Sequence, residues 1–321
     1  MISFSNPIVG KCMTMCPESE IRFRQSHNMV HPMEKSRGDG SKFLKADVHR
    51  MVKEYTRSAA GSDHRQADLL RPPDVLLKTV RYLLNLYRTE KASQYSMVFS
   101  FVCDRLRAVR QDMVLQQCPA LDSTRILQEM IPFYFETDYL CRTKNCDTYD
   151  WKLHSTQLEE CLSRWIETVA AIPRHFADSR LICSYILYNI PHYSALLDLY
   201  DWREFLDSGT FDALRDIILA FRANNYVRFF RRLHEVSSDS IVVAAVQAVQ
   251  IIRRRALHAI SIAYKSPNNK LPVTAISKWL YHEHASDLLR CFSVPCSDLI
   301  LVSSINMNDN DDSYRLLAEI D

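Results

Sequence analysis

The sequence predicts an all-α protein, an irregular α-solenoid of amphipathic helices that ends in a small winged-helix module. Three observations support this prediction. Apolar residues recur at spacings of three and four over long stretches, as they do on one face of a helix. Most prolines fall between these stretches, where helices end. The chain has only five glycines in 321 residues, against an average of about 7%, and none lies in a GxGxxG or GxxxxGK[ST] loop. A glycine-rich nucleotide-binding fold is therefore excluded.

The N-terminal segment differs from the rest of the chain. Residues 1–45 are polar, with Gly38 and Gly40 in a cluster of small and charged residues, and we expect an extended arm with little core of its own. Residues 46–264 are expected to form the helical stack. Its main apolar faces are Leu76, Val80, Leu83, Leu84, Tyr87; Tyr95, Val98, Val102, Leu106, Val109, Met113; Leu158, Leu162, Trp165, Val169, Ile172; and Val242, Val246, Val249, Ile252, Ala256, Ile260, Ala263.

The pattern changes near the C-terminus. Leu271 and Pro272 begin a short helix over roughly 273–281, a second helix follows over 285–292, and an extended apolar run covers 299–302. Two short helices followed by a strand fit a winged-helix module over residues 265–305. Residues 306–321 are expected to form an acidic tail.

Charge is unevenly distributed along the chain. Residues 214–290 carry 12 Lys and Arg against five Asp and Glu, whereas residues 291–321 carry one against six. A basic segment before an acidic one indicates a surface that faces a polyanion. The ten cysteines form no CxxC pair, and no apolar run is long enough for a signal peptide or a membrane span. We therefore expect an intracellular protein with reduced thiols.

Two cysteines four residues apart stand out near the N-terminus. Cys12 and Cys16 precede Pro17, and His27 and His31 lie downstream. The spacing is unlike that of zinc fingers or zinc knuckles, so we expect the two thiols to serve packing and to bind no metal. A cysteine nucleophile would need a His and an Asn or Asp nearby, and no local signature indicates one.

A second motif reads DRLRAVRQD. On a helix, its polar residues Asp104, Arg107 and Gln111 share one face, while Leu106 and Val109 face inward. Alternating charges at this spacing are typical of surface pairs or bridges to a neighbouring helix, and a catalytic Asp/Arg site is the alternative. We expect a structural motif in which Arg105 and Arg107 bridge neighbouring helices. Its charged and polar members are Asp104, Arg105, Arg107, Arg110, Gln111 and Asp112.

Basic side chains cluster around the predicted winged helix and the helices before it. The leading candidates for nucleic-acid binding are Lys265, Lys270 and Lys278, and the weaker ones are Arg231, Arg232 and Arg254. Lysines on a winged helix can neutralise phosphates without reading bases. The alternative is a solvated helix surface that pairs with the acidic tail.

At these residues the chain resembles the Sac-three/GANP family, named for a yeast mRNA-export scaffold and for germinal-centre-associated nuclear protein. The blocks that carry the resemblance run over nearly the full length. They are Gly10, Cys12 and Met15-Cys16-Pro17-Glu18; Val52-Lys53-Glu54-Tyr55 with Arg57-Ser58; Leu70-Arg71-Pro72 with Val75-Leu76, Thr79 and Tyr82-Leu83; Asp104-Arg105 with Arg107 to Asp112; Asn225-Tyr226 with Phe229-Phe230; and Arg255-Ala256-Leu257 with Leu271-Pro272.

The resemblance implies a PCI-like domain, an irregular tetratricopeptide-like helical stack that ends in a small winged helix. It also implies two partners, a PCI-domain protein and a small acidic peptide protein, and a joint surface for RNA or DNA. Because the chain carries neither Phe-Gly repeats nor a long C-terminal helix, it looks most like the short Sac-three-domain-containing branch, which is linked to centrosomes and spindle.

Our leading prediction is a non-enzymatic nuclear scaffold in mRNA export coupled to transcription, without cofactor, membrane or small-molecule substrate. The alternative is an adaptor of the centrosome and spindle, acting in centrosome duplication and mitotic progression without nucleic-acid binding; the cytoplasm is a further expected location. A hydrolytic enzyme is the third reading.

Overall fold

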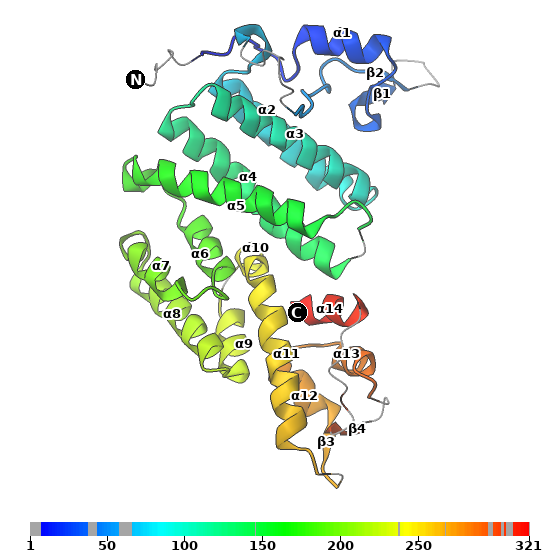
Figure 1. Ribbon diagram of the computed structural model, residues 1–321, viewed down its shortest axis with the longest axis vertical. Coiled ribbons are helices and arrows are strands. Elements are labelled where there is room, and N and C mark those ends of the chain that lie inside the picture. Colours follow the sequence, from blue (N-terminus) through cyan, green and yellow to red (C-terminus); the bar gives the residue numbers. More distant parts are fainter. Residues whose placement is uncertain are drawn as a thin grey trace. The chain divides into compact units, whose positions relative to one another are not determined.

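The structure is a computed structural model, and it is predominantly helical, as the sequence predicts (Figure 1). It describes residues 8–37, 44–57, 66–144, 146–236, 238–266, 268–294, 298–302, 305 and 311–320. The chain divides into two compact units, taken in turn below. One comprises residues 1–134 and 146–176, and the other residues 135–145 and 177–321. Helix α4 contributes residues to both.

The first unit begins with short elements and continues with long helices. In chain order they are α1 (Glu18–Ser26), η1 (Pro32–Glu34), β1 (Lys35–Arg37), β2 (Leu44–Ala46), η2 (Ala67–Leu69), α2 (Pro73–Glu90), α3 (Tyr95–Leu115), α4 (Ala120–Thr143), α5 (Trp151–Ala170) and η3 (Arg174–Phe176). Strands β1 and β2 pair antiparallel, with Lys35 opposite Ala46. The segment expected to be an extended arm thus contains a helix and a strand pair, and Cys16, Ile21 and Met51 form a small core there.

The helix ends follow local chemistry. Pro73 occupies the first turn of α2, where its missing N–H costs nothing. Asp150 caps α5 by accepting hydrogen bonds from the N–H groups of Lys152 and Leu153. Pro132 is an exception to the prediction that prolines mark helix ends, because it lies inside α4, where it has no N–H to donate to the preceding turn.

The apolar faces predicted for α2, α3 and α5 are buried almost throughout. They are amphipathic helices whose single apolar stripe is removed from water by the neighbouring helices, and each fully buried aliphatic side chain contributes about 1.5–3 kcal/mol. Trp165 is the largest of these side chains and is completely buried.

The second unit is built around one long helix. Its elements are α6 (Ser179–Tyr188), α7 (Ala195–Asp201), η4 (Arg203–Phe205), α8 (Ser208–Arg222), α9 (Tyr226–His234), α10 (Asp239–Val242), η5 (Val243–Ala245), α11 (Val246–Ala263), β3 (Lys270–Pro272), α12 (Val273–Leu280), α13 (Ala285–Cys291), β4 (Leu299–Leu301) and α14 (Asp311–Ala318). The single helix predicted over 242–263 is wrong in one respect, because a 3-10 turn separates α10 from α11.

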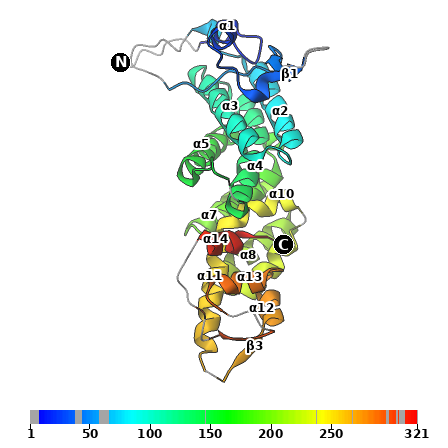
Figure 2. The same cartoon turned by 90° about the vertical axis from the view of Figure 1, so that its right-hand side faces the viewer.

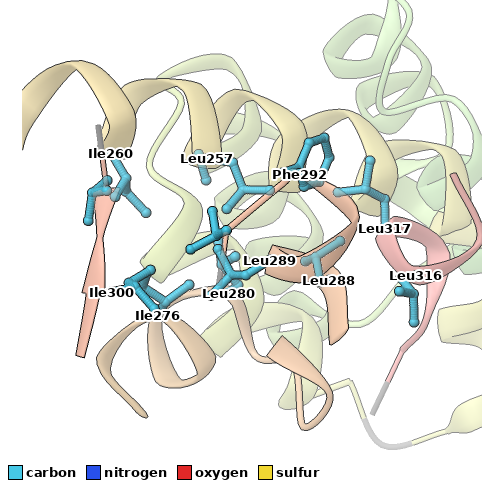
Figure 3. Close-up of a cluster of buried hydrophobic side chains, with 13 residues drawn as sticks. Leu257, Ile260, Ile276, Leu280, Leu288, Leu289, Phe292, Ile300, Leu316 and Leu317 are labelled. Carbon is cyan, nitrogen blue, oxygen red and sulfur yellow. The ribbon is translucent and has the colours of Figure 1, made fainter. Parts of the chain in front are cut away.

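The C-terminal part of this unit, which we call the C-terminal module (β3 to β4), packs on α11. Strands β3 and β4 pair antiparallel, with Leu271 opposite Ile300, and α12, α13 and β3 gather along α11 (Figure 2). Helices α11 to α14 and β4 share one apolar core (Figure 3). Its members include Leu257, Ile260, Ile276, Leu280, Leu288, Leu289, Phe292, Ile300, Leu316 and Leu317.

The segment expected to be an acidic tail contributes to this core. Leu317 and Ala318 of α14 are almost fully buried, so two apolar residues in a polar segment fix the helix against α11 and α13. Among the described residues, none of the helices combines the length and apolar character that a bilayer-spanning segment requires.

Candidate functional site

The DRLRAVRQD block lies in the middle of α3, and the Arg105 guanidinium belongs to a buried cluster of charged side chains. Arg105 donates to Glu54 at 2.8 Å and lies 3.4 Å from Glu34. Arg24 of α1 binds the same two carboxylates, at 2.7 Å to Glu34 and 3.1 Å to Glu54. Two arginines and two carboxylates therefore neutralise one another where Arg24 and Glu34 are removed from water, as buried charges require.

The outer face of the same block holds a stretch of extended chain. Asp104 accepts a hydrogen bond from the Tyr55 N–H at 3.3 Å, and Gln111 donates to the Thr56 carbonyl at 2.8 Å. Between them, the Arg107 guanidinium lies 4.0 Å from the centre of the Tyr55 ring, a cation–π contact. The face predicted for Asp104, Arg107 and Gln111 is thus a binding face for the chain's own residues 55–56.

Asp112 forms a second buried charge cluster on α3. Its carboxylate accepts from Lys53 at 2.6 Å and from the Arg71 Nε at 2.7 Å. Asp112 and Arg71 have no exposed surface, and Lys53 also donates to the Leu69 carbonyl at 2.8 Å. One carboxylate thereby joins α3 to the segments before and after η2.

These contacts correct the prediction made for Arg105 and Arg107. Arg105 and Arg107 do not bridge neighbouring long helices; Arg105 pairs with Glu34 and Glu54, and Arg107 lies over Tyr55, because the N-terminal segment covers this face of α3. Arg110 is the residue of the block that joins two long helices. It donates to the Gln157 carbonyl at 2.9 Å and pairs with Glu160, both on α5.

The two N-terminal cysteines are buried in this unit. Cys12 lies against Thr14, and Cys16 accepts a hydrogen bond from Arg24 at 3.3 Å, next to Pro17, the residue that precedes α1. Burial raises the pKa of the Cys16 thiol to about 12, which keeps it protonated and weakens it as a metal ligand or nucleophile. Within the described part of the chain, no three His, Cys, Asp or Glu side chains converge as a metal site.

Gly10 shows why this motif begins with glycine. Its N–H donates to the Gln116 side chain at 2.8 Å, and an added Cβ would lie 2.4 Å from the Leu70 carbonyl oxygen. Only glycine allows the backbone to approach this closely, so the start of the motif is fixed by packing against the end of α3.

His31 makes the stability of this unit depend on pH. Burial lowers its pKa below the ordinary value, and the nearby Arg105 lowers it further; its Nδ1 accepts from the Met33 N–H. The unfolded chain therefore binds a proton at His31 at a higher pH than the folded chain does. The free energy of unfolding is expected to fall as the pH drops from about 7 to 5. The variant His31→Asn, measured by urea unfolding at both pH values, should lose less stability than the wild type. The exposed His27→Asn serves as control, and equal losses in all three proteins would contradict the assignment.

One cavity in the first unit brings a cysteine and a histidine together. Its volume is about 180 Å³, and Cys103, His154 and Asp104 are among its lining residues. The His154 Nε2 lies 2.9 Å from the Tyr134 carbonyl oxygen, so this nitrogen donates its proton to the backbone of α4.

The basic residues predicted to bind nucleic acid lie in the second unit. Lys265 follows α11, Lys270 begins β3 and Lys278 lies on α12, and all three are exposed. We call them the three module lysines. Within the part of the chain that the structure describes, none of these three lysines forms an ion pair.

The weaker candidates differ from one another. Arg231 on α9 is exposed, and Arg254 on α11 is half-buried. Arg232 is already engaged, at 3.3 Å from Asp216 and 2.7 Å from Glu235. A phosphate would have to compete with these carboxylates for Arg232, which leaves the three module lysines as the better candidates.

Sequence reasoning missed Arg253, which is buried beside these residues. Its guanidinium donates to the carbonyl oxygens of Leu280 and Tyr281 at the end of α12, and to those of Leu317 and Glu319 after α14. A cation at a helix C-terminus meets the negative end of the helix dipole. The signal was present, because position 253 lies four residues after Val249 and three before Ala256, on the buried stripe of α11.

The chain is similar in sequence to members of one protein family. The family model described as the SAC3/GANP family matches residues 15–296. The chain is 24% identical to Protein xmas of Drosophila melanogaster over 96% of the chain and 16% of that protein, and 24% identical to SAC3 family protein 1 of Schizosaccharomyces pombe over 94% and 31%. It is 34% identical to SAC3 family protein B of Arabidopsis thaliana over 39% of the chain and 7% of that protein.

The chain spans less than a third of the length of each of these relatives. The family match includes residues of both structural units, from the Cys16 motif to the end of α13 and a few residues beyond. The chain therefore belongs to the SAC3/GANP family.

Proposed function

We propose that this chain is a non-enzymatic scaffold subunit in mRNA export coupled to transcription. In this role it pairs with a PCI-domain protein and a small acidic peptide protein in the nucleus, and it binds RNA or DNA through the three module lysines. Family membership and the predominantly helical fold support a scaffold. The chemistry of the first unit supports it too, because its buried charged side chains pair with one another inside the fold.

The observation that carries the nucleic-acid part of the proposal is the C-terminal module. Helix α11 is followed by strand, helix, helix and strand, and the two strands pair, which is the element order of a winged helix. Lys270 and Lys278 lie on this module and Lys265 lies just before it, and all three are exposed, so they can neutralise phosphates. Phosphate contacts alone predict binding with little sequence preference.

Exposed apolar residues near the end of α11 and on β4 support the pairing with a partner. Ile262 is 60% exposed and Leu299 is 53% exposed, near the end of α11 and on β4. Beside them, the rings of Tyr264 and Trp279 stack with their centres 6.3 Å apart. Such apolar side chains next to lysines suit an interface where a second protein and a nucleic acid meet.

Charge reversal tests the nucleic-acid part. The double variant Lys270→Glu/Lys278→Glu should bind single-stranded RNA more weakly whatever its sequence, because repulsion replaces two phosphate contacts. For each contact removed, the slope of log affinity against log salt should become shallower by about 0.7. Fluorescence anisotropy at several salt concentrations measures both quantities.

The matched control changes the net charge equally elsewhere. Lys11 and Lys152 are exposed in the first unit, so Lys11→Glu/Lys152→Glu should retain most of the affinity and the full salt slope. If Lys270→Glu/Lys278→Glu binds as the wild type does, the module lysines are not the nucleic-acid site. The centrosomal-adaptor reading would then take precedence.

Affinity purification with mass spectrometry tests the partner part. We expect a PCI-domain protein together with a small acidic protein among the recovered proteins. Recovery of centrosomal and spindle proteins without either of them would contradict the export scaffold.

A further inference from the structure

Helix α7 carries an exposed apolar stripe in the second unit. Tyr193, Leu197 and Tyr200 are 91%, 67% and 57% exposed. Leu197 and Tyr200, three residues apart on α7, share one face, and Tyr193 lies in the turn immediately before the helix. Large apolar residues are often exposed singly, but a row of three such side chains marks an interaction surface.

Helix α8 extends this surface. The Tyr200 ring packs against Phe211 with the centres 5.2 Å apart, and Arg222 donates to the Tyr193 carbonyl. The end of α7 thus meets the start of α8, and its start meets the end of α8, so the two helices run antiparallel, side by side in Figure 1. Leu219 on α8, 44% exposed, lies one turn before Arg222 and widens the apolar stripe.

The charges beside the stripe are mainly acidic. Asp198 and Asp201 follow Leu197 on the same helix, and neither forms an ion pair within the described part of the chain. Asp198 accepts a hydrogen bond from the Ser194 hydroxyl at 3.3 Å; burial and the charge of Asp201 raise its pKa, and the nearby His192 opposes this rise. The two carboxylates therefore lie close enough to repel each other.

The nearest arginines do not supply the missing positive charge. Arg203 lies over the Phe211 ring, 4.4 Å from its centre, and donates to the Leu206 carbonyl at 3.3 Å. Arg222 is bound to the Tyr193 carbonyl on the opposite end of α7. A cation from outside would relieve the repulsion between Asp198 and Asp201.

We propose that the α7 stripe (Tyr193, Leu197 and Tyr200, with Leu219) binds a basic amphipathic helix of a partner protein. Apolar residues of that helix at spacings of three and four would cover the stripe, and its Lys or Arg side chains would pair with Asp198 and Asp201. The two carboxylates disfavour nucleic acid and anionic lipid. A two-fold contact with a second copy would bring the same carboxylates together.

This surface is separate from the module lysines. The lysines lie after α11, on β3 and on α12, whereas the stripe lies on α7, on α8 and in the turn before α7. A scaffold with both surfaces could hold a protein on one and a polyanion on the other, so the loss of either is measurable without the other.

The first test uses a model ligand. The probe is a fluorescent 18-residue helical peptide of Leu and Lys, compared with a peptide of the same pattern in which Glu replaces Lys. The Leu/Lys peptide should bind the full chain at least tenfold more tightly than the Leu/Glu peptide. The variant Tyr193→Ser/Leu197→Ser should weaken it about tenfold or more, and Asp198→Asn/Asp201→Asn should weaken it severalfold and flatten its salt dependence.

The control is Val114→Ser on α3, which removes an apolar side chain of similar exposure, 68%, and should leave the affinity unchanged. Equal binding by the wild type and the two α7 variants would overturn the proposal, and so would equal binding of the two peptides. Because the α7 side chains are exposed, circular dichroism of the variants should match the wild type. Binding of RNA by these variants should be unchanged, which separates this proposal from the proposed function.

The second test identifies the occupant in cells. A photo-cross-linking amino acid at position 197 should give an adduct with a protein segment that is basic and amphipathic, absent when the same group is at position 114. That segment, made as a peptide, should show the same dependence on Leu197, Asp198 and Asp201. Adducts only with nucleic acid, lipid or a second copy of this chain, or none above the control, would overturn the proposal.

Discussion

Replacing Asp112 with asparagine should lower the free energy of unfolding of the first unit by about 3–5 kcal/mol. Asp112 and Arg71 have no exposed surface, and the carboxylate is the acceptor that Arg71 and Lys53 share, at 2.7 Å and 2.6 Å. A neutral amide at this position leaves two positive charges facing each other where water cannot reach them. The loss should appear as a lower urea midpoint and as faster amide exchange in α2 and α3.

The matched control removes a carboxylate from a pair near the surface. Glu160 pairs with Arg110 but is 52% exposed, so Glu160→Gln should cost less than about 1 kcal/mol. If Asp112→Asn and Glu160→Gln have similar effects, the buried cluster on α3 does not hold the N-terminal segment as we describe.

Replacing Arg253 with methionine should cost about 3 kcal/mol in the second unit. The change keeps an apolar side chain in contact with Phe230, whose ring centre lies 5.0 Å from the guanidinium, but removes the donor for four carbonyl oxygens. A buried carbonyl without a donor costs about 1–3 kcal/mol, and some of the four regain water. Amide exchange should rise at the end of α12 and in residues 315–320.

The neighbouring Arg255 provides the control for this variant. It is exposed and lies over the Phe221 ring at 5.1 Å, so Arg255→Met should change the free energy of unfolding by less than about 1 kcal/mol. Equal exchange rates in the two variants near residues 315–320 would show that Arg253 does not hold α14.

The helical stack could be predicted because its signal is local. A buried stripe on a helix repeats every three or four residues, and Leu83, Leu106 and Leu158 follow that repeat into the core. The short elements of the C-terminal module were predicted from the same kind of signal, together with Pro272. The break between α10 and α11 left no signal, since a 3-10 turn keeps the same apolar residues buried.

The partners of the DRLRAVRQD block could not be predicted in this way. Periodicity shows which side chains share a face, but not which segment covers it. Lys53 and Asp112 are 59 residues apart, and Arg105 and Glu34 are 71 apart. The sequence therefore indicated that Arg105 would be paired, and the prediction placed its partner on the wrong element.

The module lysines were predicted from charge alone, and the structure adds their exposure and their place on a strand-paired module. Arg253 shows the limit of that reasoning. It carries a charge, but its position on the α11 stripe makes it a core residue.

Ultraviolet cross-linking of the full chain to single-stranded RNA, with mass spectrometry of the cross-linked peptides, tests the nucleic-acid claim most directly. We predict adducts within residues 265–280, reduced in Lys270→Glu/Lys278→Glu and unchanged in Lys11→Glu/Lys152→Glu. Adducts confined to residues 8–176, or no adducts under conditions where a known RNA-binding protein gives them, would contradict it.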